Sequence, residues 1–140
     1  MSHPVPEGYQ PIDFGIPFLQ LIGPVYHKVE APVLHLAMRI EHKHCNALGS
    51  VHGGLLATLA DVASVRALVQ ARNNGQRAFT ISLNTDYIGQ AVEGDWIEAH
   101  ITIKKGSGGV AFALCEIKVD DKLIVVSSGS FKFFTPSEAS

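Results

Sequence analysis

A single segment, residues 53–72, limits the folds that are open to this chain, because it is apolar on nearly every face that an α-helix could present. Its leucines, valines and alanines recur at helical spacing and leave scarcely any polar stripe. A surface helix keeps a polar side toward water, so a helix of this kind has to be covered on most sides. Asn73, Asn74 and Gly75 follow it in the manner of a left-handed helix cap.

The rest of the chain has the period-two alternation of strands with one buried face. One such stretch, 33–41, precedes the helix, with Leu34, Leu36, Met38 and Ile40 on one side. Four follow it, at 78–87 (Phe79, Ile81, Leu83), 96–104 (Ile97, Ala99, Ile101, Ile103), 110–119 (alternating through Phe112 and Leu114) and 123–134. Turns at 106–109 and 120–122 suit hairpins. The order β-α-β-β-β-β predicts an α+β fold, with a curved antiparallel sheet wrapped around the helix.

The chain is expected to form one domain. Its 140 residues suit a single core, and no linker or repeat divides them. Residues 1–13 are expected to be a flexible lead-in, and residues 14–136 the domain itself. Helical spacing over 14–22, interrupted by Pro17 and ended by Gly23-Pro24, predicts a short N-terminal helix.

Composition narrows the function classes. Hydrophobic residues make up 46% of the chain and charged residues 17%, which excludes a disordered chain and suggests surface buried between subunits. The net charge is −2 and no basic stripe is present, which argues against a nucleic-acid partner. No uninterrupted apolar run reaches the ~18–20 residues of a membrane span, and the N-terminus lacks the features of a signal peptide. We expect a cytoplasmic protein with two free thiols, Cys45 and Cys115.

Two glycines, Gly53 and Gly54, open the long helix, and an acid, Asp61, follows two turns later. Glycine lets a ligand approach the backbone, and the first amides of a helix lack partners at the positive end of its dipole. Such amides suit an oxygen that gains negative charge. An acid on an apolar helix is costly without a task or a partner, so the combination indicates acyl chemistry. In a purely structural interpretation, Asp61 could accept a hydrogen bond from a neighbouring backbone amide, and the two glycines could allow the helix to pack closely on the sheet.

The run from Asn46 to Gly54 (Asn-Ala-Leu-Gly-Ser-Val-His-Gly-Gly), followed by Asp61, resembles the hotdog-fold acyl-CoA thioesterases of the PaaI-like, phenylacetate-pathway type. The resemblance covers Phe14 to Phe134. It implies the hotdog fold and hydrolysis of an aryl- or medium-chain acyl-CoA, with no cofactor other than the coenzyme A of the substrate. It also implies a homodimer that pairs into a homotetramer.

The resemblance implies a role for each matching residue. Asp61 would be the general base or the nucleophile, the Gly53 amide would hold the thioester carbonyl oxygen, and Asn46 would line the same site. Thr80 matches the position of a hydroxyl residue that helps to place water beside the acid, where some relatives have serine.

The spacing of Gly53 and Asp61 has a geometric consequence of its own. Eight residues of helix separate them by about 12 Å at about 1.5 Å per residue. Reacting groups must lie within about 3–3.5 Å, so a carbonyl at Gly53 cannot use Asp61 of the same chain. If both act, one must come from a second subunit, and an isologous dimer with antiparallel central helices would build two shared sites.

Further candidates for substrate contact are less specific. Leu56, Ala60 and Ser64 are expected to line an acyl pocket, and Gly54 and His52 lie beside the carbonyl position, although His52 fits a loop anchor better. Lys104 and Lys105 could meet the phosphates of coenzyme A, but lysines at the end of a strand are usually just solvated.

Other functions stay open beside the thioesterase. Hydratases and dehydratases of the same fold pair Asp with His, or His with Glu, and residues 62–66 after Asp61 contain neither His nor Glu. A module that binds acyl-CoA without turnover is a further alternative. No metal is expected, because His42, His44, Cys45 and His52 lack the second pair of ligands that a zinc site needs.

Overall fold

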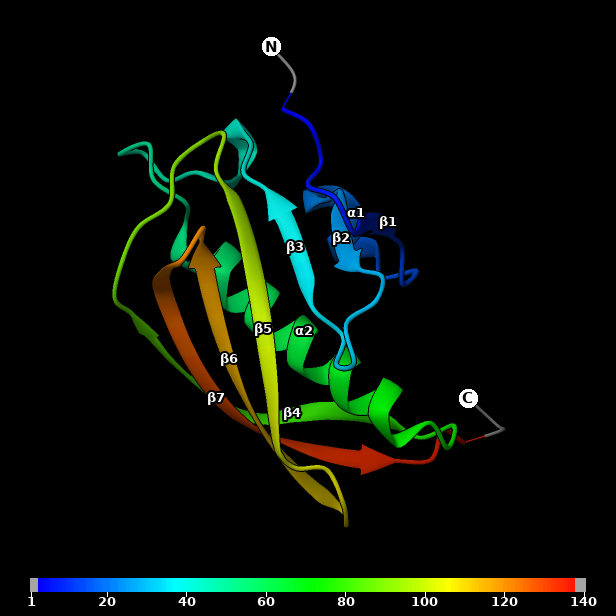
Figure 1. The fold of residues 1–140 in the computed structure, drawn as a ribbon. Helices are drawn as coiled ribbons and strands as arrows, with labels where there is room; N and C mark the ends of the chain where they lie inside the picture. The colour runs from blue at the N-terminus through cyan, green and yellow to red at the C-terminus, as the bar shows by residue number, and fades with distance from the viewer. Residues whose placement is uncertain (1–2, 138–140) are drawn as a thin grey trace.

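The structure is a computed structural model that describes residues 3–137. Its elements in chain order (Figure 1) are β1 (Tyr9–Ile12), α1 (Pro17–Ile22), β2 (Val25–Lys28), β3 (Leu36–Arg39), the 3-10 helix η1 (His42–His44), α2 (Gly53–Arg72), β4 (Arg77–Tyr87), β5 (Trp96–Lys105), β6 (Val110–Val119) and β7 (Lys122–Phe134).

All seven strands form one antiparallel sheet in the order β1-β2-β3-β5-β6-β7-β4. The sheet curves around α2, which crosses its concave side (Figure 1). Small side chains let the helix approach the strands closely, and the residues that α2 buries are Leu55, Leu56, Leu59, Ala60, Ala63, Ser64, Ala67 and Leu68. The predicted α+β architecture, with a long central helix, a curved antiparallel sheet and a short N-terminal helix, is confirmed.

Helix α2 ends where the sequence predicts and has a notable length. Asn73 adopts the left-handed conformation (φ 47°) and donates its N–H to the Val69 carbonyl, as the cap signal predicts. No uninterrupted apolar run has the length of a membrane span, yet α2, with 20 residues, is long and apolar enough to cross a bilayer on length and composition alone. Its leucine-rich face instead forms the core against the sheet.

The N-terminal region has more regular structure than predicted. Strand β1 lies within the expected lead-in and pairs with β2, and neither strand was expected. Pro17 begins α1 rather than interrupting a helix, because the first turn does not need the N–H that proline lacks. Strand β3 is shorter than the alternating stretch 33–41, although the apolar residues of that stretch, from Leu34 to Ile40, are buried as predicted.

In two strands, the side chains that face the core differ from those that the sequence pattern predicts. In β4 the register shifts between Thr80 and Ser82, so Phe79 (53% exposed) and Ile81 (54%) face outward while Leu83 packs against the core. Such a bulge inserts one residue and reverses the alternation after it. In β6, Phe112 is exposed, and the buried side is formed by Ala111, Ala113, Cys115 and Ile117.

Both cysteines are free thiols, as predicted. Cys45 is partly buried after η1, and Cys115 is buried in β6. Burial raises the pKa of the Cys115 thiol to about 12. Cys115 therefore stays protonated near neutral pH and is a core residue rather than a nucleophile.

Candidate active site

The N-terminus of α2 leaves one backbone amide available to a ligand. His52 is the N-cap residue, and its Nδ1 accepts the Gly54 N–H at 2.8 Å. Among residues 3–137, nothing accepts a hydrogen bond from the Gly53 N–H. The predicted role of His52 as an anchor agrees with this contact. The Gly54 amide is already engaged, so Gly53 is the donor that can meet an incoming oxygen.

Tyr87, at the end of β4, holds the first turn of α2 from the other side. Its hydroxyl donates to the Gly53 carbonyl at 2.8 Å. A Cβ on Gly53 would lie only 3.3 Å from the Tyr87 ring, so glycine at this position permits the close approach. The sequence offers no signal for this contact, because a tyrosine at the end of a strand is unremarkable.

Asn46 shapes the loop that precedes α2. Its Oδ1 accepts the N–H groups of Leu48 (2.9 Å) and Ser50 (3.2 Å), and its Nδ2 donates to the Ser50 hydroxyl (3.0 Å). This is the common turn-building role of asparagine. The amide nitrogen carries two hydrogens, so one remains for a ligand. Asn46 also lines a cavity of about 400 Å³ together with Gly53, Leu56 and Tyr87.

Asp61 lies on the side of α2 that faces β4 and is half-buried. The Thr80 hydroxyl donates a short hydrogen bond to Asp61 Oδ1. The β4 bulge follows Thr80 directly, which is the kind of irregularity that re-aims a neighbouring side chain. In the described part of the chain, Asp61 accepts no bond from a backbone amide, so the purely structural interpretation of this acid finds no partner there.

The two groups of residues lie in different cavities of the single chain. Asp61 and Thr80 line a space of about 280 Å³, which shares no lining residue with the cavity around Asn46 and Gly53. The structure therefore forms each predicted pair but does not bring the two pairs together within one chain. This agrees with the separation of about 12 Å along α2.

The remaining candidates take varied positions. Leu56 lines the cavity beside Gly53, whereas Ala60 (0% exposed) and Ser64 (1%) lie under the sheet and line neither cavity. This follows from the helix, since both belong to the face of α2 that packs on the strands. Lys104 and Lys105 are exposed at the end of β5 and also line neither cavity.

His44 in η1 has a structural role. His44 is buried, and its ring bridges the Glu41 N–H (2.9 Å) and the Ile22 carbonyl, which ties η1 to the end of α1. Within residues 3–137, no group of three or more His, Cys, Asp or Glu side chains could hold a metal ion.

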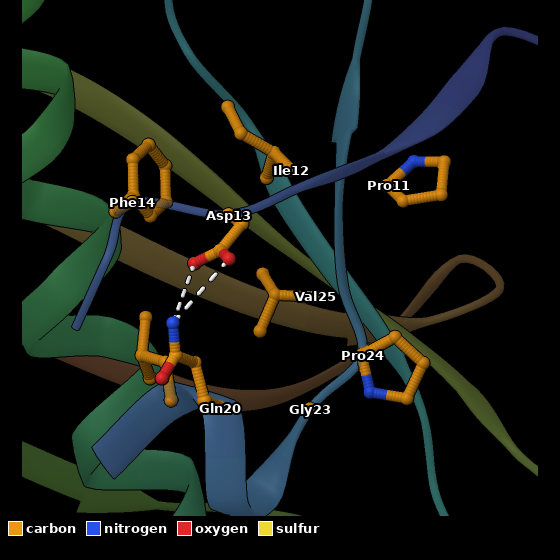
Figure 2. Close-up of a pocket in the computed structure, with 9 residues that line it drawn as sticks. Pro11, Ile12, Asp13, Phe14, Gln20, Gly23, Pro24 and Val25 are labelled. Atoms are coloured by element: carbon orange, nitrogen blue, oxygen red, sulfur yellow. Dashed lines mark hydrogen bonds between the residues drawn. The ribbon is translucent and has the colours of Figure 1, made fainter. Parts of the chain in front are cut away.

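A larger cavity of about 490 Å³ lies in the N-terminal region, between β1, α1 and β2 (Figure 2). Its walls are mostly apolar, with Asp13 and Gln20 as polar members. The Gln20 amide lies 3.4 Å from both carboxylate oxygens of Asp13, as the dashed lines in Figure 2 show. None of the predicted site residues lines this cavity, so its size alone does not make it the active site.

Comparison with known proteins gives consistent matches. The sequence profile of the thioesterase superfamily matches residues 48–136. A proposed esterase of Pseudomonas aeruginosa is 41% identical over 128 residues, which cover 91% of this chain and 96% of that protein. Mouse acyl-coenzyme A thioesterase 13 is 36% identical over 89 residues, 62% of this chain and 63% of that protein. A solved mutant of the phenylacetic acid degradation protein PaaI of Thermus thermophilus has 26% identity and a TM-score of 0.72, covering 84% of this chain and 98% of that chain.

Proposed function

Since this chain belongs to the thioesterase superfamily and is a thioester hydrolase of the hotdog fold, we propose that it hydrolyses an acyl-CoA to the free acid and coenzyme A, using sites shared between two subunits. The family and the fold confirm the resemblance seen in the sequence. The observation that carries the proposal is the division of the site, with a free helix-terminal amide in one cavity and a carboxylate held by a hydroxyl in another.

The surface of the protomer supports a dimer. Strand β4 is 11 residues long and lies at the end of the sheet, and β7 is its one partner strand among residues 3–137. Long apolar edges of this kind are normally covered in native proteins. Phe79 and Ile81 on β4, Ile88 just after it, and Leu48 (93% exposed) near Asn46 all present apolar side chains to solvent. Phe79 lines the cavity of Asp61 and Ile88 lines the cavity of Gly53, so a partner that covered both would lie over the two half-sites.

The reaction can be written from the groups in each half. The Gly53 N–H of one chain, at the positive end of α2, would polarise the thioester carbonyl and stabilise the oxyanion. Asp61 of the other chain would accept a proton from water as the water oxygen attacks the carbonyl carbon. The carbon–sulfur bond then breaks, and the proton passes from Asp61 to the coenzyme A thiolate. Thr80 occupies Oδ1 of Asp61, which leaves Oδ2 for the water.

Two relatives suggest the substrate class. One is named an acyl-coenzyme A thioesterase and the other a phenylacetic acid degradation protein. An acyl-CoA with an aryl or medium-length acyl group is therefore the starting point for assay. Asn46 and Leu56, on the walls of the cavity beside Gly53, would contact the thioester region.

Release of free coenzyme A thiol from phenylacetyl-CoA and hexanoyl-CoA, measured with a chromogenic thiol reagent, tests the proposal. Asp61→Asn should lower kcat by at least ~100-fold, the scale of a lost general base. It should leave the melting temperature nearly unchanged, because asparagine still accepts a bond from Thr80. An enoyl or hydroxyacyl product with coenzyme A still attached, binding without turnover, or full activity of Asp61→Asn would each contradict the proposal.

A further inference from the structure

Arg66 lines the same cavity as Asp61 and has no anionic partner in the part of the chain that the structure describes. It belongs to α2, five residues beyond Asp61, and lines the space of about 280 Å³ with Asp61 and Thr80. Across residues 3–137, Arg66 makes no hydrogen bond and no ion pair, and its Nε is buried without an acceptor. By contrast, Arg39 and Arg72 both donate to backbone carbonyls.

The surroundings of Arg66 hold its guanidinium in place without satisfying its hydrogen bonds. The guanidinium carbon stacks 4.5 Å from the centre of the Phe14 ring. Apart from Asp61 and Thr80, the other residues that line this cavity are apolar, namely Ile16, Val62, Val65, Ala78 and Phe79. Arg66 also lines an adjoining, more polar space with Gln70 and Arg77. Phe14 also lines the N-terminal cavity, where Figure 2 labels it, so one ring contributes to that cavity and stacks on Arg66.

A cation that is partly removed from water gains from an anion that accepts its N–H bonds, and the planar guanidinium fits a carboxylate with two parallel bonds. We infer that Arg66 binds a carboxylate carried by the acyl group of the substrate, so that this chain selects acyl-CoA thioesters whose acyl chain ends in a carboxylate. The inference rests on the proposed thioesterase function, since it takes the thioester carbon to lie beside Asp61.

Distance favours the acyl group over the phosphates of coenzyme A as the source of the anion. Arg66 lies about 7.5 Å beyond Asp61 along the axis of α2. The pantetheine arm between the sulfur and the first phosphate is peptide-like, and its roughly 14 chain atoms span about 15 Å when extended. The guanidinium is therefore much nearer to the reacting carbon than those phosphates are. A chain of four to six carbons with a terminal carboxylate suits the separation.

Matched pairs of substrates test the inference with the full-length protein. Glutaryl-CoA and pentanoyl-CoA have the same chain length and differ in the terminal carboxylate, as do adipoyl-CoA and hexanoyl-CoA. The parent should have a higher kcat/KM for the diacid member of at least one pair. Arg66→Met, which keeps an apolar stem against Phe14, should lower that preference by about 10- to 100-fold. Activity on the neutral member should be retained. Arg66→Lys, which keeps the charge but not the planar fork, should keep part of the preference.

The outcomes separate this inference from the proposed function. If no thioester releases coenzyme A, the proposed function itself is wrong. If hexanoyl-CoA is hydrolysed but Arg66→Met leaves the ratio of adipoyl-CoA to hexanoyl-CoA unchanged, only the role of Arg66 is wrong. If Arg66→Met lowers activity on both substrates alike and dissociates the oligomer, Arg66 is an interface residue, which also overturns the inference.

Discussion

Complementation between two inactive variants tests whether the halves of the active site come from different chains. The first variant, Gly53→Pro, removes the available amide hydrogen at the start of α2. Proline is well accepted at the first helical position. The residue before a proline must be extended, and His52 already has φ −63° and ψ 133°. The substitution should therefore remove a donor without unfolding the helix.

Gly53→Ala is the matched control for this variant. Alanine places a Cβ at the same point, 3.3 Å from the Tyr87 ring, but keeps the N–H. A Cβ requires the Tyr87 ring to move by a few tenths of an ångström in both variants, so the two differ at the amide itself, where proline replaces the N–H with a ring carbon. We expect Gly53→Pro to lower kcat by about 10²–10³, the usual cost of removing an oxyanion donor. Gly53→Ala should keep activity of the same order as the parent.

The second variant, Asp61→Ala, removes the acid from the other half. Random pairing of equal amounts of Gly53→Pro and Asp61→Ala chains makes about half of the dimers mixed, each with one complete site and one doubly defective site, so activity should recover to about a quarter of the parent value. Dimers purified through two different affinity tags should reach about half. Asp61→Ala mixed with Thr80→Val should show no such recovery, because both changes fall in the same half.

Thiol release from hexanoyl-CoA measures the recovery, and light scattering verifies that the mixed species is an oligomer. Mixed dimers of native mass that are no more active than either variant alone would refute the shared site. Recovery in the Asp61→Ala and Thr80→Val mixture would refute the assignment of those two residues to one half.

Two further predictions concern single side chains. Thr80→Val, which removes the hydroxyl bonded to Asp61, should lower kcat by about tenfold with little change in melting temperature; Thr80→Ser keeps the hydroxyl and should stay near the parent, and equal activity of all three proteins would contradict the contact's role. Burial, with His100 and Lys28 nearby, lowers the pKa of His35 below its ordinary value of 6.5. As the pH falls, His35 in the unfolded chain therefore binds a proton before His35 in the folded chain does. The free energy of unfolding is thus unaffected by this group above about pH 6.5 and decreases as the pH falls below that value. His35→Gln should lose less melting temperature than the parent between pH 7.5 and pH 5.5, and parallel melting curves would count against this reasoning.

The sequence predicts the central part of the fold well, because long elements repeat their pattern several times. Helix α2 has five turns of apolar residues, and its cap at Asn73 is a local signal. Strands β1 and β2 have only four residues each, too few for alternation to stand out, and β1 includes a proline. The bulge after Thr80 also lies beyond a pattern argument, since it is set by pairing with β7.

The sequence likewise predicts some contacts of the candidate site and misses others. The contact between Asp61 and Thr80, 19 residues apart, is anticipated through the family resemblance. Tyr87 and Arg66 are not, because their roles depend on neighbours that are distant in the chain. A single arginine on a helix usually indicates a solvated side chain, and only the fold brings Phe14 and Ile16 beside Arg66. Ala60 and Ser64 show the opposite case, in which helical spacing correctly groups residues but not the surface that they face.

The outward-facing Phe79 and Ile81 also bear on how the protein can be handled. A lone protomer would expose these rings and methyl groups on a strand with open hydrogen-bonding groups, a combination that promotes aggregation. Chains that lose the partner but keep these apolar side chains should therefore precipitate during expression instead of accumulating as soluble monomers. Solubility would then indicate whether the chains assemble, and Ile81→Lys, which places a charge on the exposed side of β4, should give a soluble single chain for comparison.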